Sequence, residues 1–227
     1  MTDFPHGGDV RGLARGLGCA PEDILDFSAS INPLGPPEWL RTTISSAVSS
    51  LVHYPDPHCR ALVSAASARL SAPEEEVIAG NGTSELIFAL ARTCGHARAV
   101  IPVPAYRDYE EACLRAGMAV TPVPLSEKDG FALDPAEISR AIAQAGGAAL
   151  VFVARPNNPT GRDVPAETVR RLAAAHPDCL FAVDEAFGSF VRGFESLAAG
   201  RPGNGAELAS LTKMFAVPGL RLGLAVA

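Results

Sequence analysis

Short apolar segments alternate along the chain with longer segments of helical spacing, and this alternation constrains the fold more than any other feature. The short segments are rich in Val, Ile, Leu and Phe, while the longer ones place apolar residues every three to four positions. The predicted strands are 76–80, 98–103, 118–123, 148–154, 179–187 and 220–227, and the predicted helices are 84–94, 106–117, 134–146 and 165–175. We therefore expect an α/β fold with a mostly parallel, mixed sheet flanked by helices.

The first part of the chain has a different pattern. It contains Gly and Pro clusters, "HGG" and "INPLGPP", and little strand alternation. We predict that residues 1–45 form an arm or a segment of a smaller domain, and that residues 46–227 form the large domain. The sequence stops inside a predicted strand, so we expect a C-terminal domain to be absent from it.

Composition excludes several classes of function. The net charge is -6, with no run of basic residues, which argues against a nucleic-acid partner and favours a small molecule. The five cysteines are scattered, odd in number and without a CxxC pair, so we expect reduced thiols and no metal site. The N-terminus has no signal pattern, and no apolar run approaches the roughly 20 residues of a membrane span, so the expected location is the cytoplasm.

Lys213 stands out because the chain has only two lysines, the other being Lys128, among 19 basic residues. A guanidinium keeps its charge, whereas an ammonium can lose a proton and become a nucleophilic amine. The flanking sequence "SLTKMFAVPGLRLG" (210–223) is too apolar for a freely solvated side chain. Burial would lower the pKa of Lys213, and an amine in that state is suited to forming a Schiff base with a carbonyl.

Three polar motifs follow predicted strands, where α/β sheets bind ligands. They are "GNGTSE" (80–85), "RPNNPTG" (155–161) and "DEAF" (184–187). The first could hold a phosphate on free backbone N–H groups, or could be an ordinary helix cap, and Glu85 replaces the third glycine of a dinucleotide fingerprint. The second could be a simple turn. Asp184 ends a buried strand and needs a cation or proton donor, although a structural ion pair would also satisfy it.

A Lys, an acid and a phosphate cup together meet the requirements of a pyridoxal phosphate site. The three motifs "RPNNPTG", "VDEAF" and "SLTKMFAVPGLRLG" resemble, in this order, those of the class I/II aminotransferase family of fold-type I pyridoxal phosphate enzymes. By this resemblance Lys213 would bind the cofactor covalently and transfer protons, Asp184 would pair with the pyridine nitrogen, and Asn158 would bind the phenolic oxygen. The residues that resemble the phosphate-binding set are Gly82, Thr83, Ser210 and Arg221.

Three aromatic positions also bear on the resemblance: two match the family and one departs from it. Tyr106 matches the aromatic residue that stacks on the cofactor ring, although it could also be a core residue at a helix start. Tyr54 matches a residue that reaches the phosphate of the neighbouring subunit, which implies a homodimer with shared sites. Phe187 departs from the pattern, because many relatives have a Tyr there that donates a second hydrogen bond to the phenolic oxygen.

The start of the chain bears on the reaction. Residues 6–37, with "HGG" and "DFSASINPLGPP", resemble the cobalamin-pathway threonine-phosphate decarboxylases, in which His6, Gly7 and Asn32 would lie at the substrate. Terminal exposure of His6 and a turn role for Asn32 stay open. Histidinol-phosphate aminotransferases are similar in "YPDP", "PNNPTG" and the lysine motif. We expect the decarboxylase, acting on a small phosphorylated amino acid; the alternatives are that aminotransferase, a cofactor-binding fragment without turnover, and a Rossmann-type nucleotide module.

Overall fold

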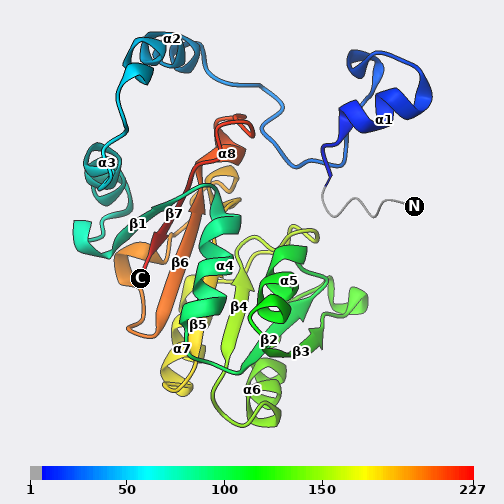
Figure 1. The fold of residues 1–227 in the computed structure, drawn as a ribbon. Helices are drawn as coiled ribbons and strands as arrows, with labels where there is room; N and C mark the ends of the chain where they lie inside the picture. Colours follow the sequence, from blue (N-terminus) through cyan, green and yellow to red (C-terminus); the bar gives the residue numbers. More distant parts are fainter. Residues whose placement is uncertain (1–6) are drawn as a thin grey trace.

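The computed structural model describes residues 7–227, and Figure 1 shows their arrangement. The main helices are α1 (Val10–Leu17), α2 (Glu38–Ala47), α3 (Arg60–Leu70), α4 (Thr83–Thr93), α5 (Arg107–Arg115), α6 (Pro135–Gln144), α7 (Ala166–Ala175) and α8 (Leu211–Met214). The strands are β1 (Val77–Gly80), β2 (Arg98–Val103), β3 (Ala119–Pro124), β4 (Leu150–Ala154), β5 (Leu180–Asp184), β6 (Gly205–Ser210) and β7 (Gly223–Val226). Short 3-10 turns join several of them. Within residues 7–227, no helix combines the length and apolar character needed to cross a membrane.

The strands form one sheet in the order β1-β7-β6-β5-β4-β2-β3. The four pairs from β6 to β3 are parallel, whereas β7 runs antiparallel to both of its neighbours. The prediction of a mostly parallel, mixed sheet is therefore confirmed. The strands β1, β4, β5 and β6 run in the same direction, so the loops that follow their carboxyl ends lie on the same side of the sheet.

Helices cover both faces of the sheet, as the alternation predicted. In β4, Val151 and Val153 point to the face packed by α6 and α7, while Leu150 and Phe152 point to the face packed by α4 and α5. Side chains of a strand alternate between faces, so a strand buried on both sides must be apolar at every position. The apolar run "LVFVA" is this pattern.

The structure differs from the sequence prediction at one central strand. β6, with the sequence "GAELAS", lies between β5 and β7 but was not among the predicted strands. Its small residues and its Glu207 give no strand signal, because Ala and Glu are depleted in strands. Residues 205–210 form a strand because β5 and β7 pair with them on either side.

The N-terminal segments lie apart from the main body of the sheet (Figure 1). α3 packs on the β1 and β7 side through Ala66, next to Val77 and Leu224. α1 and α2 bury little surface, and Ala14 is the one residue of these two helices that is buried. The predicted boundary at residue 45 falls within α2 and stays a prediction.

Candidate active site

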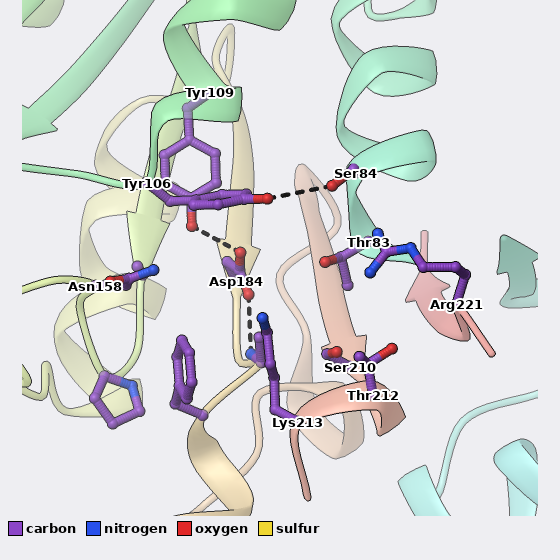
Figure 2. Close-up of a pocket in the computed structure, with 14 residues that line it drawn as sticks. Thr83, Ser84, Tyr106, Tyr109, Asn158, Asp184, Ser210, Thr212, Lys213 and Arg221 are labelled. Atoms are coloured by element: carbon purple, nitrogen blue, oxygen red, sulfur yellow. Dashed lines mark hydrogen bonds between the residues drawn. The ribbon is translucent and has the colours of Figure 1, made fainter. Parts of the chain in front are cut away.

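The polar motifs meet in a pocket at the carboxyl ends of β1, β4, β5 and β6 (Figure 2). Seven of the predicted site residues line it: Thr83, Tyr106, Asn158, Asp184, Ser210, Lys213 and Arg221. They come from separate elements between residues 83 and 221, so the fold alone brings them together.

Asp184 is the last residue of β5 and is buried at the pocket wall. Its Oδ2 accepts a hydrogen bond of 2.7 Å from the hydroxyl of Tyr109, and its Oδ1 accepts one of 2.9 Å from the backbone N–H of Ala186. Burial raises the pKa of Asp184, while these two hydrogen bonds and the nearby Lys213 oppose the rise. This is an environment in which a bound cation or N–H donor would favour the ionised carboxylate.

Lys213 lies on α8, a single helical turn between β6 and β7. Figure 2 shows its amine and the Asp184 carboxylate pointing into the same pocket. Burial lowers the pKa of Lys213, and the positive charge of Arg221 lowers it further. A larger neutral fraction makes the amine a better nucleophile, as the sequence predicted.

An anion-binding arrangement lies beside the lysine. α4 begins after Gly82, which has a positive φ of 80° and makes no side-chain cap, so backbone N–H groups of the first helical turn face the pocket wall. A Cβ on Gly82 would lie 2.5 Å from Nη2 of Arg221, so a larger residue there would displace the guanidinium, and the positive φ also favours glycine. The guanidinium of Arg221, the helix N-terminus and the Ser210 hydroxyl together suit a phosphate.

Tyr106 lies across the pocket at the start of α5 (Figure 2). Its hydroxyl donates to Oδ2 of Asp108 at 2.7 Å and lies 3.3 Å from the Ser84 hydroxyl. These contacts hold the ring in place over the site. Phe187 also lines the pocket, as an apolar residue without a hydrogen-bond donor.

A larger cavity of about 590 Å³ adjoins this pocket and is closed partly by the N-terminal segment. Gly7 and residues 28–31 line it, together with Tyr106, Asn158 and Lys213. His6, predicted at the substrate, lies outside the described residues.

Asn32 and Tyr54 occupy different surroundings. The Asn32 side chain donates to the backbone carbonyl of Met214 at 2.9 Å, and its backbone N–H donates to that of Lys213 at 3.1 Å, so Asn32 holds the segment that carries the lysine. Tyr54 is fully exposed and does not line the pocket of its own chain.

Two residues that contact the predicted site residues were not themselves predicted from the sequence. Tyr109 contacts Asp184, and Ser84 contacts Tyr106. The spacing of Tyr106 and Tyr109 carries a signal, because residues three apart share one helix face. Ser84 carries no such signal, since the sequence alone shows only a polar residue in the first turn of a helix.

Comparisons with known proteins agree with this geometry. The family model "Aminotransferase class I and II" matches residues 22–227. The adenosylcobalamin biosynthesis bifunctional protein CobDQ of Leptospira interrogans is 36% identical over 98% of this chain and 26% of its own length. The threonine-phosphate decarboxylase of Salmonella typhimurium is 34% identical over 100% of this chain and 62% of its own length.

A solved structure with the same fold is the histidinol-phosphate aminotransferase from Clostridium acetobutylicum, with a TM-score of 0.79 at 29% identity. The alignment covers 89% of this chain and 60% of that protein. The chain thus spans less than two thirds of the length of these relatives. With a family match over most of its residues, the chain belongs to the class I and II aminotransferase family, whose members are pyridoxal phosphate-dependent aminotransferases and decarboxylases.

Proposed function

We propose that this chain forms the pyridoxal phosphate site of an L-threonine O-3-phosphate decarboxylase, giving (R)-1-aminopropan-2-yl phosphate for cobalamin biosynthesis. The observation that carries the cofactor site is the convergence of Lys213, Asp184 and the anion-binding start of α4 on one pocket. The substrate assignment rests on the N-terminal segment.

The chemistry of the pocket fits pyridoxal phosphate. The cofactor has an aldehyde, a basic ring nitrogen and a phosphate, and the pocket offers an amine, a buried carboxylate and a set of anion donors. Gly82 has a positive φ, and its lack of a Cβ leaves room for the Arg221 guanidinium beside the start of α4. When bound, pyridoxal phosphate supplies an electron sink for charge that develops on the substrate.

Each pocket residue then has a defined task. Lys213 would bind the aldehyde carbon of the cofactor, and its amine, once free, would hold the proton that is delivered to the substrate. Asp184, kept in place by Tyr109 and Ala186, would hold a proton on the ring nitrogen. Asn158 would bind the phenolic oxygen and Tyr106 would contact the ring, while the phosphate would be held by Gly82, Thr83, Ser210 and Arg221.

The N-terminal segment supports the decarboxylase. Gly7 and residues 28–31 border the cavity that contains Lys213, so they are in position to orient a substrate. They belong to the stretch of sequence that resembles threonine-phosphate decarboxylases. The CobDQ protein of Leptospira interrogans and the threonine-phosphate decarboxylase of Salmonella typhimurium align over at least 98% of the chain and so include this stretch, as does the histidinol-phosphate aminotransferase of Moorella thermoacetica, so the support comes from the residues of the stretch itself. Orientation of the substrate decides which bond at Cα is broken.

A histidinol-phosphate aminotransferase is the second candidate. Enzymes with this activity match the chain at comparable identity, 32% for that of Moorella thermoacetica. The pocket itself suits both reactions, because both need the same lysine, acid and phosphate contacts.

Carbon dioxide release separates the candidates. The purified protein with pyridoxal phosphate should release carbon dioxide from threonine phosphate and should not transfer an amino group from glutamate to imidazole acetol phosphate. The reverse result would assign the aminotransferase. Cofactor binding with neither reaction would support the third alternative, a binding chain without turnover.

We also propose that the active unit is a homodimer in which Tyr54 reaches the phosphate bound by the other subunit. The full exposure of Tyr54 supports this role, because an apolar ring gains by being covered. Sedimentation should show a dimer, and Tyr54→Phe should weaken cofactor binding severalfold without changing the dimer. A monomeric active protein would contradict the proposal.

A further inference from the structure

Behind the pocket lies a buried charge cluster that the proposed function does not use. It consists of Arg155 at the end of β4, Glu185 after β5, and Glu207 in β6. The side chains of Arg155 and Glu185 are each 2% exposed, and Glu207 is 1% exposed. Charged groups are buried this deeply only when they are paired or neutral.

Arg155 joins several segments. It pairs with Glu185, its Nε donates to the carbonyl of Val164 at 2.6 Å, and its Nη2 donates to that of Glu195 at 3.2 Å. Its guanidinium also lies 4.9 Å from the ring centre of Phe194. Arg155 thus ties together both ends of the loop that carries Asn158, the residue after Asp184, and the loop at 194–195.

The cluster contains two carboxyl groups and one guanidinium, and the guanidinium of Arg155 pairs with Glu185. Ser196 donates to Oε2 of Glu207 at 3.1 Å, and the next N–H along the chain, that of Leu197, donates to Oε1 of Glu185 at 3.0 Å, so one short segment contacts both buried carboxyl groups. Two neighbouring buried carboxylates repel each other, which favours a proton on one of them. Glu185 holds the negative charge because Arg155 and the Leu197 N–H bind it, which leaves the proton on Glu207.

We propose that Arg155 is a positioning residue, which sets Asn158 against Asp184 through Glu185, and that protonated Glu207 keeps this cluster neutral. This inference rests on the proposed function only in the identity of the ligand, pyridoxal phosphate, that Asn158 and Asp184 would contact. When Glu207 loses its proton, two carboxylates share one cation, and the junction between the two loops weakens.

The surroundings of Glu207 support this assignment. Burial, and after it the negative charge of Glu185, raise the pKa of Glu207 to about 8. Among the described groups, Arg69 of α3 faces the cavity next to both carboxyls, while Arg155 pairs with Glu185 rather than Glu207. Ser196 and the Ala198 N–H act in the opposite direction.

The first test is the pH dependence of unfolding in native protein and Glu207→Gln, which mimics the protonated side chain. The pKa of Glu207 is raised above its ordinary value of 4.5 to about 8, so its contribution is present at low pH and is lost across this window. We expect the native unfolding constant, relative to the Gln variant, to rise about tenfold per pH unit there. A pH-independent ratio would overturn the proposal.

The second test is the affinity for pyridoxal phosphate, measured by fluorescence titration at pH 7 and pH 9. Above pH 8 the native protein should lose affinity relative to Glu207→Gln, and Arg155→Lys should lose about tenfold at both pH values. The matched control is Arg170→Lys, because Arg170 binds Glu195 from the surface at 2.8 Å and should leave affinity unchanged. Equal affinity of native protein and both cluster variants would overturn the positioning role. If the native protein binds no cofactor, the proposed function fails, while the unfolding test still decides the proton on Glu207.

Discussion

The sheet region buries its apolar side chains, whereas the N-terminal segment leaves many of its large apolar side chains exposed to solvent. Among residues 7–227, every buried apolar residue apart from Ala14 lies at or after Ala66. Before that point, large apolar side chains stand in solvent, and the most exposed, at 77% or more, are Leu25, Phe27, Leu34, Leu51, Val52 and Tyr54.

This contrast separates two sources of structure. The sheet region holds itself together, since its strands and helices bury each other on both faces. The N-terminal segment gains little from its own chain, and two described contacts link it to the lysine-bearing turn: the hydrogen bonds of Asn32 and the edge-on contact of Trp39 with Phe215, 5.8 Å between ring centres. Exposed apolar surface of this extent is typical of a binding surface, which agrees with the proposed homodimer.

The sharpest test of the contrast compares two phenylalanines. Phe152 is 1% exposed and stacks on Tyr109 at 4.6 Å between ring centres, so Phe152→Ala should lower the free energy of unfolding by about 3–5 kcal/mol. Phe27→Ala removes a ring that is 89% exposed and should change it by less than about 0.5 kcal/mol in the monomer. Denaturant unfolding at low protein concentration measures both. A large loss at Phe27 would show that the N-terminal segment is packed.

Asp184→Asn should separate binding from stability within the sheet region. Replacing the carboxylate removes the charge that we assign to the ring nitrogen, so pyridoxal phosphate affinity should fall on the order of 100-fold. Stability should not fall, because burial raises the pKa of Asp184 and makes its ionised form costly.

The sign of the pH effect follows from the same shift. The stabilising contribution of a carboxyl with a raised pKa is present at low pH and is lost as the pH rises above its ordinary value of 3.8. The Asn variant should therefore gain stability relative to the native protein from acid to neutral pH. Unchanged cofactor affinity would remove Asp184 from the site.

Asn32→Ala should have a smaller and more local effect on stability than Phe152→Ala. It removes the 2.9 Å hydrogen bond to the Met214 carbonyl while leaving the backbone bond to Lys213. We expect a loss of about 1 kcal/mol, seen as faster hydrogen exchange in residues 211–216, with little change in the sheet. Faster exchange throughout the sheet would mean that the two regions are one cooperative unit.

The sequence predicted those parts whose signal is local. Apolar runs such as "LVFVA" and helices with three-to-four spacing predicted most of the sheet and its covering helices, and the family resemblance of the motifs predicted seven residues that line the pocket. β6 escaped prediction because its burial comes from neighbours, not from its own composition. The cluster of Arg155, Glu185 and Glu207 escaped for a related reason, since only the pairing of β4, β5 and β6 brings these charges together.

Lys213 shows the same division. Its rarity and apolar flanks predicted a buried amine, but its place on a helical turn, α8, depends on how β6 and β7 pair. The partner contacts of Tyr109 likewise depend on the packing of α5 against β5, although its spacing from Tyr106 was visible.

The central claim is that Lys213 binds pyridoxal phosphate covalently, and reductive trapping tests it most directly. The protein is incubated with the cofactor, reduced with borohydride, digested and mapped by mass spectrometry. Lys128 serves as an internal control, because it is an exposed lysine outside the motif that contains Lys213. We predict a pyridoxyl group on Lys213 and its loss in Lys213→Arg; a pyridoxyl group on Lys128 alone, or on no lysine, would contradict the account.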